Sequence, residues 1–288
     1  MHLRPAASLG LLLATLVLAV PCAASAATRF ADTAALQVAL RGTGHYDGTV
    51  DGIRGAGTRA ATAAFQRSKG LSADGVAGPR TRRALGARGR PRYGSRPLGA
   101  GARGWDVAAL QFKLAIHGFP SGPMDGALGG RTAAAISRFQ RWAGIPADGV
   151  AGRGTMRKLR RGIPRSPVSL LRPVDAAAGD RFGPRGNRFH AGLDFPAASG
   201  TPIRSAGRGT VTFAGYDASG WGNLVIISHR FGLKSFYAHL SSIGVRSGQS
   251  VGAGVRIGRV GSTGRSTGPH LHLELLLRGA NIDPASAL

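Results

Sequence analysis

Cysteine is almost absent from this sequence. The only cysteine among 288 residues is Cys22, and it lies in an N-terminal segment that we expect to be removed. The remaining chain then has no thiol, which excludes disulfides, thiolate metal ligands and a cysteine nucleophile. Any catalytic or metal site must therefore use other side chains.

A hydrophobic run long enough to cross a membrane is also missing. The main apolar stretch, residues 9–20, is shorter than the roughly 20 residues that a membrane-spanning helix needs. It follows Arg4 and precedes small residues that end at Ala26, a pattern typical of a secretory signal peptide. We expect cleavage near Ala26, secretion to the cell wall or beyond, and no stable membrane association afterwards. An uncleaved membrane anchor is the alternative.

Acidic and aromatic residues are scarce. The chain has 13 acidic against 38 basic residues, a net charge of +25, and only 6% aromatics. The excess positive charge, concentrated in residues 28–169, favours attraction to a polyanion. For an exported protein, this polyanion would be the cell wall with its anionic polymers. Nucleic acid is not expected, because no recognition motif is present. An arginine bias caused by a GC-rich genome is an equally good explanation.

An internal repeat fills the first half of the chain. Leu36–Leu85 aligns without gaps on Leu110–Leu159, so equivalent positions lie 74 residues apart. Each copy combines helical periodicity with Gly/Asp loops, which predicts a small helical unit. The predicted multidomain organisation is a signal peptide at 1–26, repeats at 30–86 and 104–161, basic or Pro-containing linkers at 87–103 and 162–169, and a C-terminal domain at 170–288. The linkers bury little apolar surface, so we expect the two halves to move independently.

Each repeat resembles the three-helix, all-α peptidoglycan-binding domain. The resemblance rests on a Tyr-x-Gly-x-x-Asp-Gly loop, a Phe-Gln pair and an Asp-Gly-x-x-Gly-x-x-Thr ending. It implies binding to bacterial peptidoglycan, with ligand contacts from the loop around Tyr46 and Asp51. The second repeat has Pro120 where the first has Tyr46, which leaves its binding open. For Phe65 and its repeat equivalent we favour core packing.

The C-terminal domain is rich in glycine and β-branched residues and predicts a mainly antiparallel β fold. Strands are expected at 210–213, 224–227 and 270–277. In the last of these, alternation places His270, His272 and Glu274 on one face. Glu274 would then either orient His272 or form a plain salt bridge.

Two histidine motifs predict a metal site in this domain. His270 and His272 present two imidazoles side by side, and His190 precedes Asp194 by four residues. Imidazole and carboxylate are the ligands that Zn²⁺ takes when cysteine is absent. With three protein ligands, a fourth position stays open for catalysis, and one histidine is left beside the metal.

These motifs occur in an order that resembles the lysostaphin/LytM-type zinc endopeptidases. The resemblance covers residues 170–288 and includes the segments 181–185, 220–223, 237–240 and 261–272. It implies zinc on His190, Asp194 and His272, with His239 and His270 as the catalytic pair. Asn223 is a further candidate for lining the substrate groove.

The function expected from both resemblances is a secreted, monomeric, zinc-dependent endopeptidase that cuts peptidoglycan and is held on the wall by two binding repeats. The alternative is a non-catalytic adaptor that activates other wall hydrolases. The sequence leaves the cleaved bond open among a D-alanyl–diaminopimelate cross-link, a glycine-containing bridge and a stem-peptide bond.

Overall fold

The computed structural model describes residues 23–288, with side chains from residue 30. The predicted signal peptide therefore lies outside the described residues, except for Ala23 to Ala26, which begin the first helix. Among the described residues, no helix is both long and apolar enough to span a bilayer.

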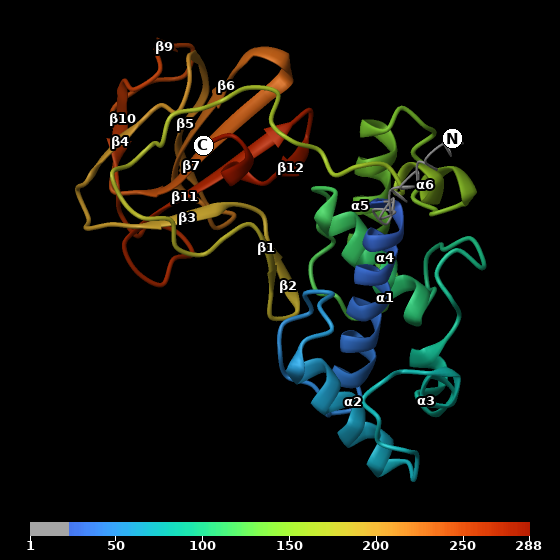
Figure 1. The fold of residues 1–288 in the computed structure, drawn as a ribbon. Coiled ribbons are helices and arrows are strands. Elements are labelled where there is room, and N and C mark those ends of the chain that lie inside the picture. The colour runs from blue at the N-terminus through green and yellow to red at the C-terminus, as the bar shows by residue number, and fades with distance from the viewer. Residues whose placement is uncertain (1–22) are drawn as a thin grey trace, which may run out of the picture.

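The fold class predicted from the sequence is confirmed: a helical first half precedes an antiparallel β domain (Figure 1). The first repeat contains three helices and a 3₁₀ turn, and the second repeats the three helices. Their bounds are α1 Ala23–Arg41, α2 Ala56–Ser68, α3 Pro79–Ala84, η1 Gly86–Gly89, α4 Trp105–Ile116, α5 Gly130–Trp142 and α6 Arg153–Lys158.

A buried glutamine fixes each Asp-Gly loop of the helical half. Gln37 donates from Nε2 to Asp51 Oδ1 at 2.7 Å, and its Oε1 accepts from the N–H of Gly52 at 2.9 Å. The left-handed φ of +74° at Gly52 lets that loop turn tightly. The same Gln–Asp–Gly arrangement recurs three more times, at Gln66–Asp74–Gly75, Gln111–Asp125–Gly126 and Gln140–Asp148–Gly149.

The two repeats pack against each other rather than standing apart. Helix α1 lies along α4, and Trp105 and Phe112 of α4 belong to the same buried cluster as Leu36 of α1. Trp105 Nε1 also donates to Asp32 Oδ1 at 3.0 Å. Two elements of equivalent sequence thus share one apolar core.

The segment between the repeats is more ordered than its composition predicts. Leu98 is fully buried, and its backbone exchanges two hydrogen bonds with Ala151, at 3.2 and 2.8 Å. Tyr93 packs against the cores of both repeats. A few apolar side chains are enough to hold this Gly/Arg-rich segment, because each one enters an existing core.

The β domain is built on a seven-stranded antiparallel sheet in the order β12-β11-β7-β6-β5-β9, with β3 also paired to β11. A three-stranded sheet, β4-β10-β8, and the hairpin β1-β2 complete it. The three strands predicted from the sequence are all present, within β5, β6 and β11. The bounds are β1 Gly183–Arg185, β2 Arg188–His190, β3 Leu193–Pro196, β4 Pro202–Arg204, β5 Gly209–Asp217, β6 Gly222–Ser228, η2 Arg230–Gly232, β7 Leu233–Leu240, β8 Ser242–Ile243, β9 Ser250–Val251, β10 Arg256–Arg259, β11 His270–Leu277, β12 Ala280–Ile282 and η3 Pro284–Ser286.

The β1-β2 hairpin joins the two halves of the molecule (Figure 1). At its tip, Gly186 O accepts a hydrogen bond from Val50 N at 2.8 Å, and Asn187 O accepts one from Met124 N at 2.9 Å. Val50 and Met124 lie 74 residues apart, so they are equivalent positions of the two repeats. Both repeats therefore contact the β domain through the same backbone position.

Candidate metal centre

Strand pairing brings the two histidine motifs together. Strand β11 pairs with β3 so that His272 lies opposite Asp194. His190 ends β2, four residues before Asp194, and its side chain is buried beside them. The residues predicted as ligands from distant parts of the sequence therefore converge at one place.

The three side chains present their ligand atoms to a common point. Asp194 Oδ1 lies 2.6 Å from His272 Nδ1 and 3.2 Å from His190 Nε2. The two nitrogens are 3.1 Å apart. One ligand atom from each residue lies within 4.8 Å of the others, a spacing that a single ion can bridge.

Outer hydrogen bonds determine which imidazole nitrogen faces this point. His190 Nδ1 lies 2.9 Å from Arg181 O, and because a carbonyl only accepts, Nδ1 carries a proton; in the neutral ring Nε2 then has the lone pair. His272 Nε2 lies 3.2 Å from Glu274 Oε1, which can only accept. In the neutral ring the proton is therefore on Nε2, and Nδ1 has the lone pair that could bind a metal. Such outer partners are typical of histidine metal ligands.

The electrostatics of the cluster favour positive charge at its centre. Burial alone would raise the pKa of Asp194, but its hydrogen bonds from His190 and His272 hold this pKa well below its usual range. Burial alone would likewise lower the pKa of His272, yet its bonds to Asp194 and Glu274 raise it to about 9. The hydrogen bonds among these side chains therefore favour a positive charge between them. Two imidazole nitrogens and one carboxylate oxygen fit Zn²⁺ with an open fourth position.

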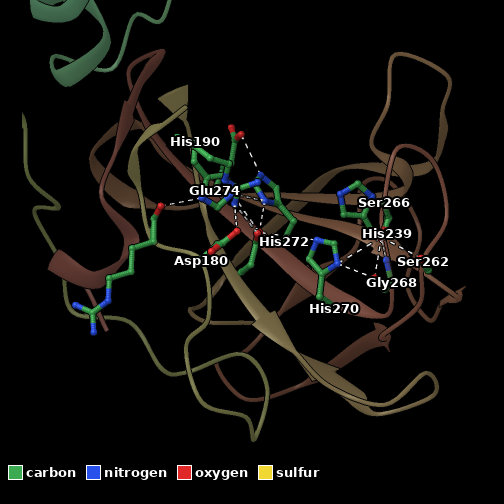
Figure 2. Close-up of polar contacts among 12 residues, drawn as sticks. Asp180, His190, His239, Ser262, Ser266, Gly268, His270, His272 and Glu274 are labelled. Carbon is green, nitrogen blue, oxygen red and sulfur yellow. Dashed lines mark hydrogen bonds and ion pairs between the residues drawn. The ribbon is translucent and has the colours of Figure 1, made fainter. Parts of the chain in front are cut away.

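His239 and His270 lie beside these ligands, with ring centroids 4.9 Å apart (Figure 2). Their Nδ1 atoms donate to carbonyl oxygens, of Thr263 for His239 and of Gly268 for His270, each at 2.8 Å. The Nε2 atom of each ring is therefore the basic one. His270 Nε2 lies 3.9 Å from Asp194 Oδ1, and burial lowers the pKa of His239.

The backbone at His239 is unusual. Its φ is +64°, a left-handed value that is uncommon and costly outside glycine. The N–H of His239 is held by Trp221 O at 2.9 Å. Backbone strain of this kind clusters at functional sites, and here it turns the ring toward His270.

An open groove of about 610 Å³ exposes the site to solvent. It is lined by all five predicted metal and catalytic residues together with Arg185 and the loop 265–269. The candidate site is therefore open to solvent rather than enclosed.

The remaining predicted residues lie elsewhere and have internal partners. Asn223 donates from Nδ2 to Leu240 O at 2.9 Å. Tyr46 donates to Thr49 O at 2.6 Å, and Asp51 accepts from Gln37 and from the N–H of Ile53. Substrate contacts by these three residues stay predictions.

Two residues that contact the candidate ligands had no role predicted from the sequence. Arg185 Nη2 lies 3.1 Å from Asp194 Oδ2, and the Trp221 ring lies 5.6 Å from the His272 ring. Both belong to segments that carried the family resemblance, which was the only signal available for them.

Comparison with known proteins matches parts of the chain to two domain families. Residues 188–284 match the model of Peptidase family M23, and residues 31–85 and 103–159 match that of a putative peptidoglycan binding domain. The chain is 48% identical over 99 residues to the DD-carboxypeptidase/endopeptidase Mpg of Neisseria meningitidis, covering 34% of this chain and 23% of that protein. It is 44% identical over 98 residues to the peptidoglycan DD-endopeptidase ShyA of Vibrio cholerae, with the same coverage.

The aligned region is therefore about a quarter of each of these curated relatives. A solved structure, a putative peptidase M23 from Pseudomonas aeruginosa, is 38% identical and matches 43% of this chain and 53% of that chain with a TM-score of 0.39.

Proposed function

Because the chain carries a peptidase family M23 domain behind two peptidoglycan-binding domains, we propose that it is a secreted zinc-dependent endopeptidase that hydrolyses peptide bonds in bacterial peptidoglycan. The observation that carries this proposal is the convergence of His190, Asp194 and His272 beside two further histidines in one open groove. The family assignment alone would not require these side chains to meet.

In this proposal, His190 Nε2, Asp194 Oδ1 and His272 Nδ1 hold the zinc ion. When bound, zinc supplies a Lewis acid that polarises a carbonyl and lowers the pKa of water to about 7. Glu274 and the carbonyl of Arg181 keep the two imidazoles in the required tautomers.

The second pair of histidines moves protons. In the neutral ring of His270, Nδ1–H is donated to Gly268 O, so Nε2 has the lone pair that would accept the proton of the attacking water and then pass it to the leaving amine. Two roles are open to His239 Nε2: orienting that water as an acceptor, or donating to the developing oxyanion once it is protonated.

The names of the relatives narrow the choice of bond. Mpg and ShyA are described as DD-peptidases, which favours a bond between two D-amino acids, as in the D-alanyl–diaminopimelate cross-link. The two repeats and the net charge of +25 would hold the enzyme on peptidoglycan and its anionic polymers.

The test is digestion of purified cell walls by the full chain, with released fragments identified by mass spectrometry. We expect new amine and carboxyl termini at a cross-link, and loss of cleavage when a chelator removes zinc. His270→Ala should abolish cleavage while zinc stays bound, whereas His272→Ala should lose the metal. His45→Ala changes a histidine of the first repeat, outside the groove, and should leave zinc binding intact.

A zinc-loaded protein that binds walls, cleaves none of the three candidate bonds and activates another hydrolase would instead identify the adaptor. Loss of zinc in His270→Ala would contradict the division into ligands and catalytic pair.

A further inference from the structure

The two oxygens of the Asp194 carboxylate face different partners. Oδ1 faces the imidazole nitrogens of His272 and His190, at 2.6 and 3.2 Å. Oδ2 faces away from them and accepts a hydrogen bond from Arg185 Nη2 at 3.1 Å. One carboxylate oxygen of Asp194 therefore faces the candidate metal position, and the other is held by the guanidinium of Arg185.

This division bears on how Asp194 binds a metal. A carboxylate can coordinate with one oxygen or with both, and a second oxygen would take a position that a catalytic zinc site needs to keep open. A hydrogen bond between a guanidinium and a carboxylate is charge-assisted and stronger than one between neutral groups. Rotating Oδ2 toward the metal would break that bond, so Arg185 disfavours the two-oxygen mode.

Arg185 is itself fixed from two sides. Its Nη2 lies 2.7 Å from Asp180 Oδ2 as well as near Asp194. An exposed pair of this kind is worth little in stability, but it orients the guanidinium. Arg185 thus bridges an exposed carboxylate and a buried one.

The helical repeats hold the hairpin next to this arginine. Residue 185 directly precedes Gly186, whose carbonyl accepts from Val50 N and whose N–H donates to Thr49 Oγ1 at 3.3 Å. The neighbouring Asn187 O is bound by Met124 N. Near the base of the hairpin, the Phe182 and Phe189 rings pack edge to face at 4.9 Å. Arg185 therefore extends from a strand that is anchored at both ends.

We infer that Arg185 is a positioning residue that holds Asp194 to one metal-binding oxygen and so preserves the open coordination position. The inference rests on the proposed zinc site and adds a residue to it. It predicts that removing the guanidinium changes the coordination number more than it changes the metal affinity.

The experiment replaces zinc by Co²⁺ in full-length protein and compares the wild type with Arg185→Met and Arg185→Lys. Methionine keeps most of the side-chain length without charge, and lysine keeps the charge. Arg188→Met is the matched control, because Arg188 is an exposed arginine opposite Arg185 in the same hairpin.

In Arg185→Met we expect a severalfold weaker visible absorption of bound Co²⁺, since five-coordinate cobalt absorbs less than four-coordinate cobalt. Zinc affinity should stay equal or rise, and kcat should fall about 10- to 100-fold with KM unchanged. Arg185→Lys should recover much of the four-coordinate spectrum, and Arg188→Met should match the wild type.

An unchanged spectrum in Arg185→Met would overturn the inference, and so would loss of zinc affinity with a wild-type spectrum for the metal still bound. If Arg185→Met fails to fold, a wild-type spectrum and kcat in Arg185→Asn would overturn it equally. Failure of the wild type to cleave walls would remove the proposed function, whereas the cobalt spectra would still decide the role of Arg185.

Discussion

Glu274→Gln offers a direct test of how the metal site is tuned. Glu274 is 7% exposed, and its two oxygens bind His272 Nε2 at 3.2 Å and Asn281 Nδ2 at 2.6 Å. Glutamine keeps the shape of Glu274 but loses the negative charge that raises the pKa of His272. Loss of such a ligand partner typically weakens metal binding about 10- to 100-fold, which corresponds to about 1.4–2.8 kcal/mol.

The measurement is competition for zinc against a chromophoric chelator of known affinity. With zinc in excess, the Gln variant should cleave walls at close to the wild-type rate, because Glu274 is not among the residues that line the groove. Leu276→Ala is the control, since Leu276 lies two residues further along the same strand face and is half-buried. Equal zinc affinity in Glu274→Gln and the wild type would refute the idea that Glu274 orients His272 and would leave it a structural ion pair.

Three further predictions concern stability. Gln140→Ala should lower the unfolding free energy by about 2–4 kcal/mol, measured by urea denaturation, because it leaves the buried N–H of Gly149 without its partner. Burial lowers the pKa of His117. Neutral His117 therefore stabilises the fold above its unfolded pKa of about 6.5, and this stabilisation is lost as the pH falls. Between about pH 7 and 5, the unfolding free energy of the wild type should fall by more than that of His117→Gln. Trp105→Phe removes the hydrogen bond to Asp32 and should destabilise the chain by about 1 kcal/mol, whereas an unchanged urea midpoint would show that this bond does not stabilise the contact between the repeats.

The grouping of histidines at the candidate metal centre could be predicted because part of its signal is local. In β11, alternation alone places His270, His272 and Glu274 on one face, and the strand spans the predicted residues. His190 and Asp194 are likewise close in sequence. The spacing could not say that β3 pairs with β11, so the convergence of the two motifs needed either the fold or the family resemblance.

The glutamines show where periodicity is insufficient. A polar residue beside Phe65 or Phe139 looks like helix surface, yet Gln66 and Gln140 are 2% exposed. Their partners lie 8–15 residues further on, in the Asp-Gly loop and in the short helix that follows it. Burial of a polar side chain depends on such tertiary partners, which no helical pattern encodes.

The expectation that residues 87–103 form a flexible linker is wrong for a related reason. Residues 87–103 have the composition of a flexible connection, and composition averages over the segment. Leu98 enters the core of the second repeat and pairs its backbone with Ala151, and Tyr93 packs against the cores of both repeats. A compositional argument does not detect these few anchoring residues, although they decide whether the segment is ordered.

Duplication explains how both helical repeats contact the β1-β2 hairpin beside the candidate metal centre. In each repeat a glutamine, Gln37 or Gln111, holds the Asp-Gly turn, and the residue just before that Asp, Val50 or Met124, donates its N–H to the hairpin tip. The contact uses backbone groups, so it survives the replacement of valine by methionine and the divergence of the surrounding loops. Two hydrogen bonds of about 0.5–1.5 kcal/mol each are too weak to join the halves by themselves, but they are directional. They fix the tip of the hairpin and, one residue before it, the strand from which Arg185 reaches Asp194.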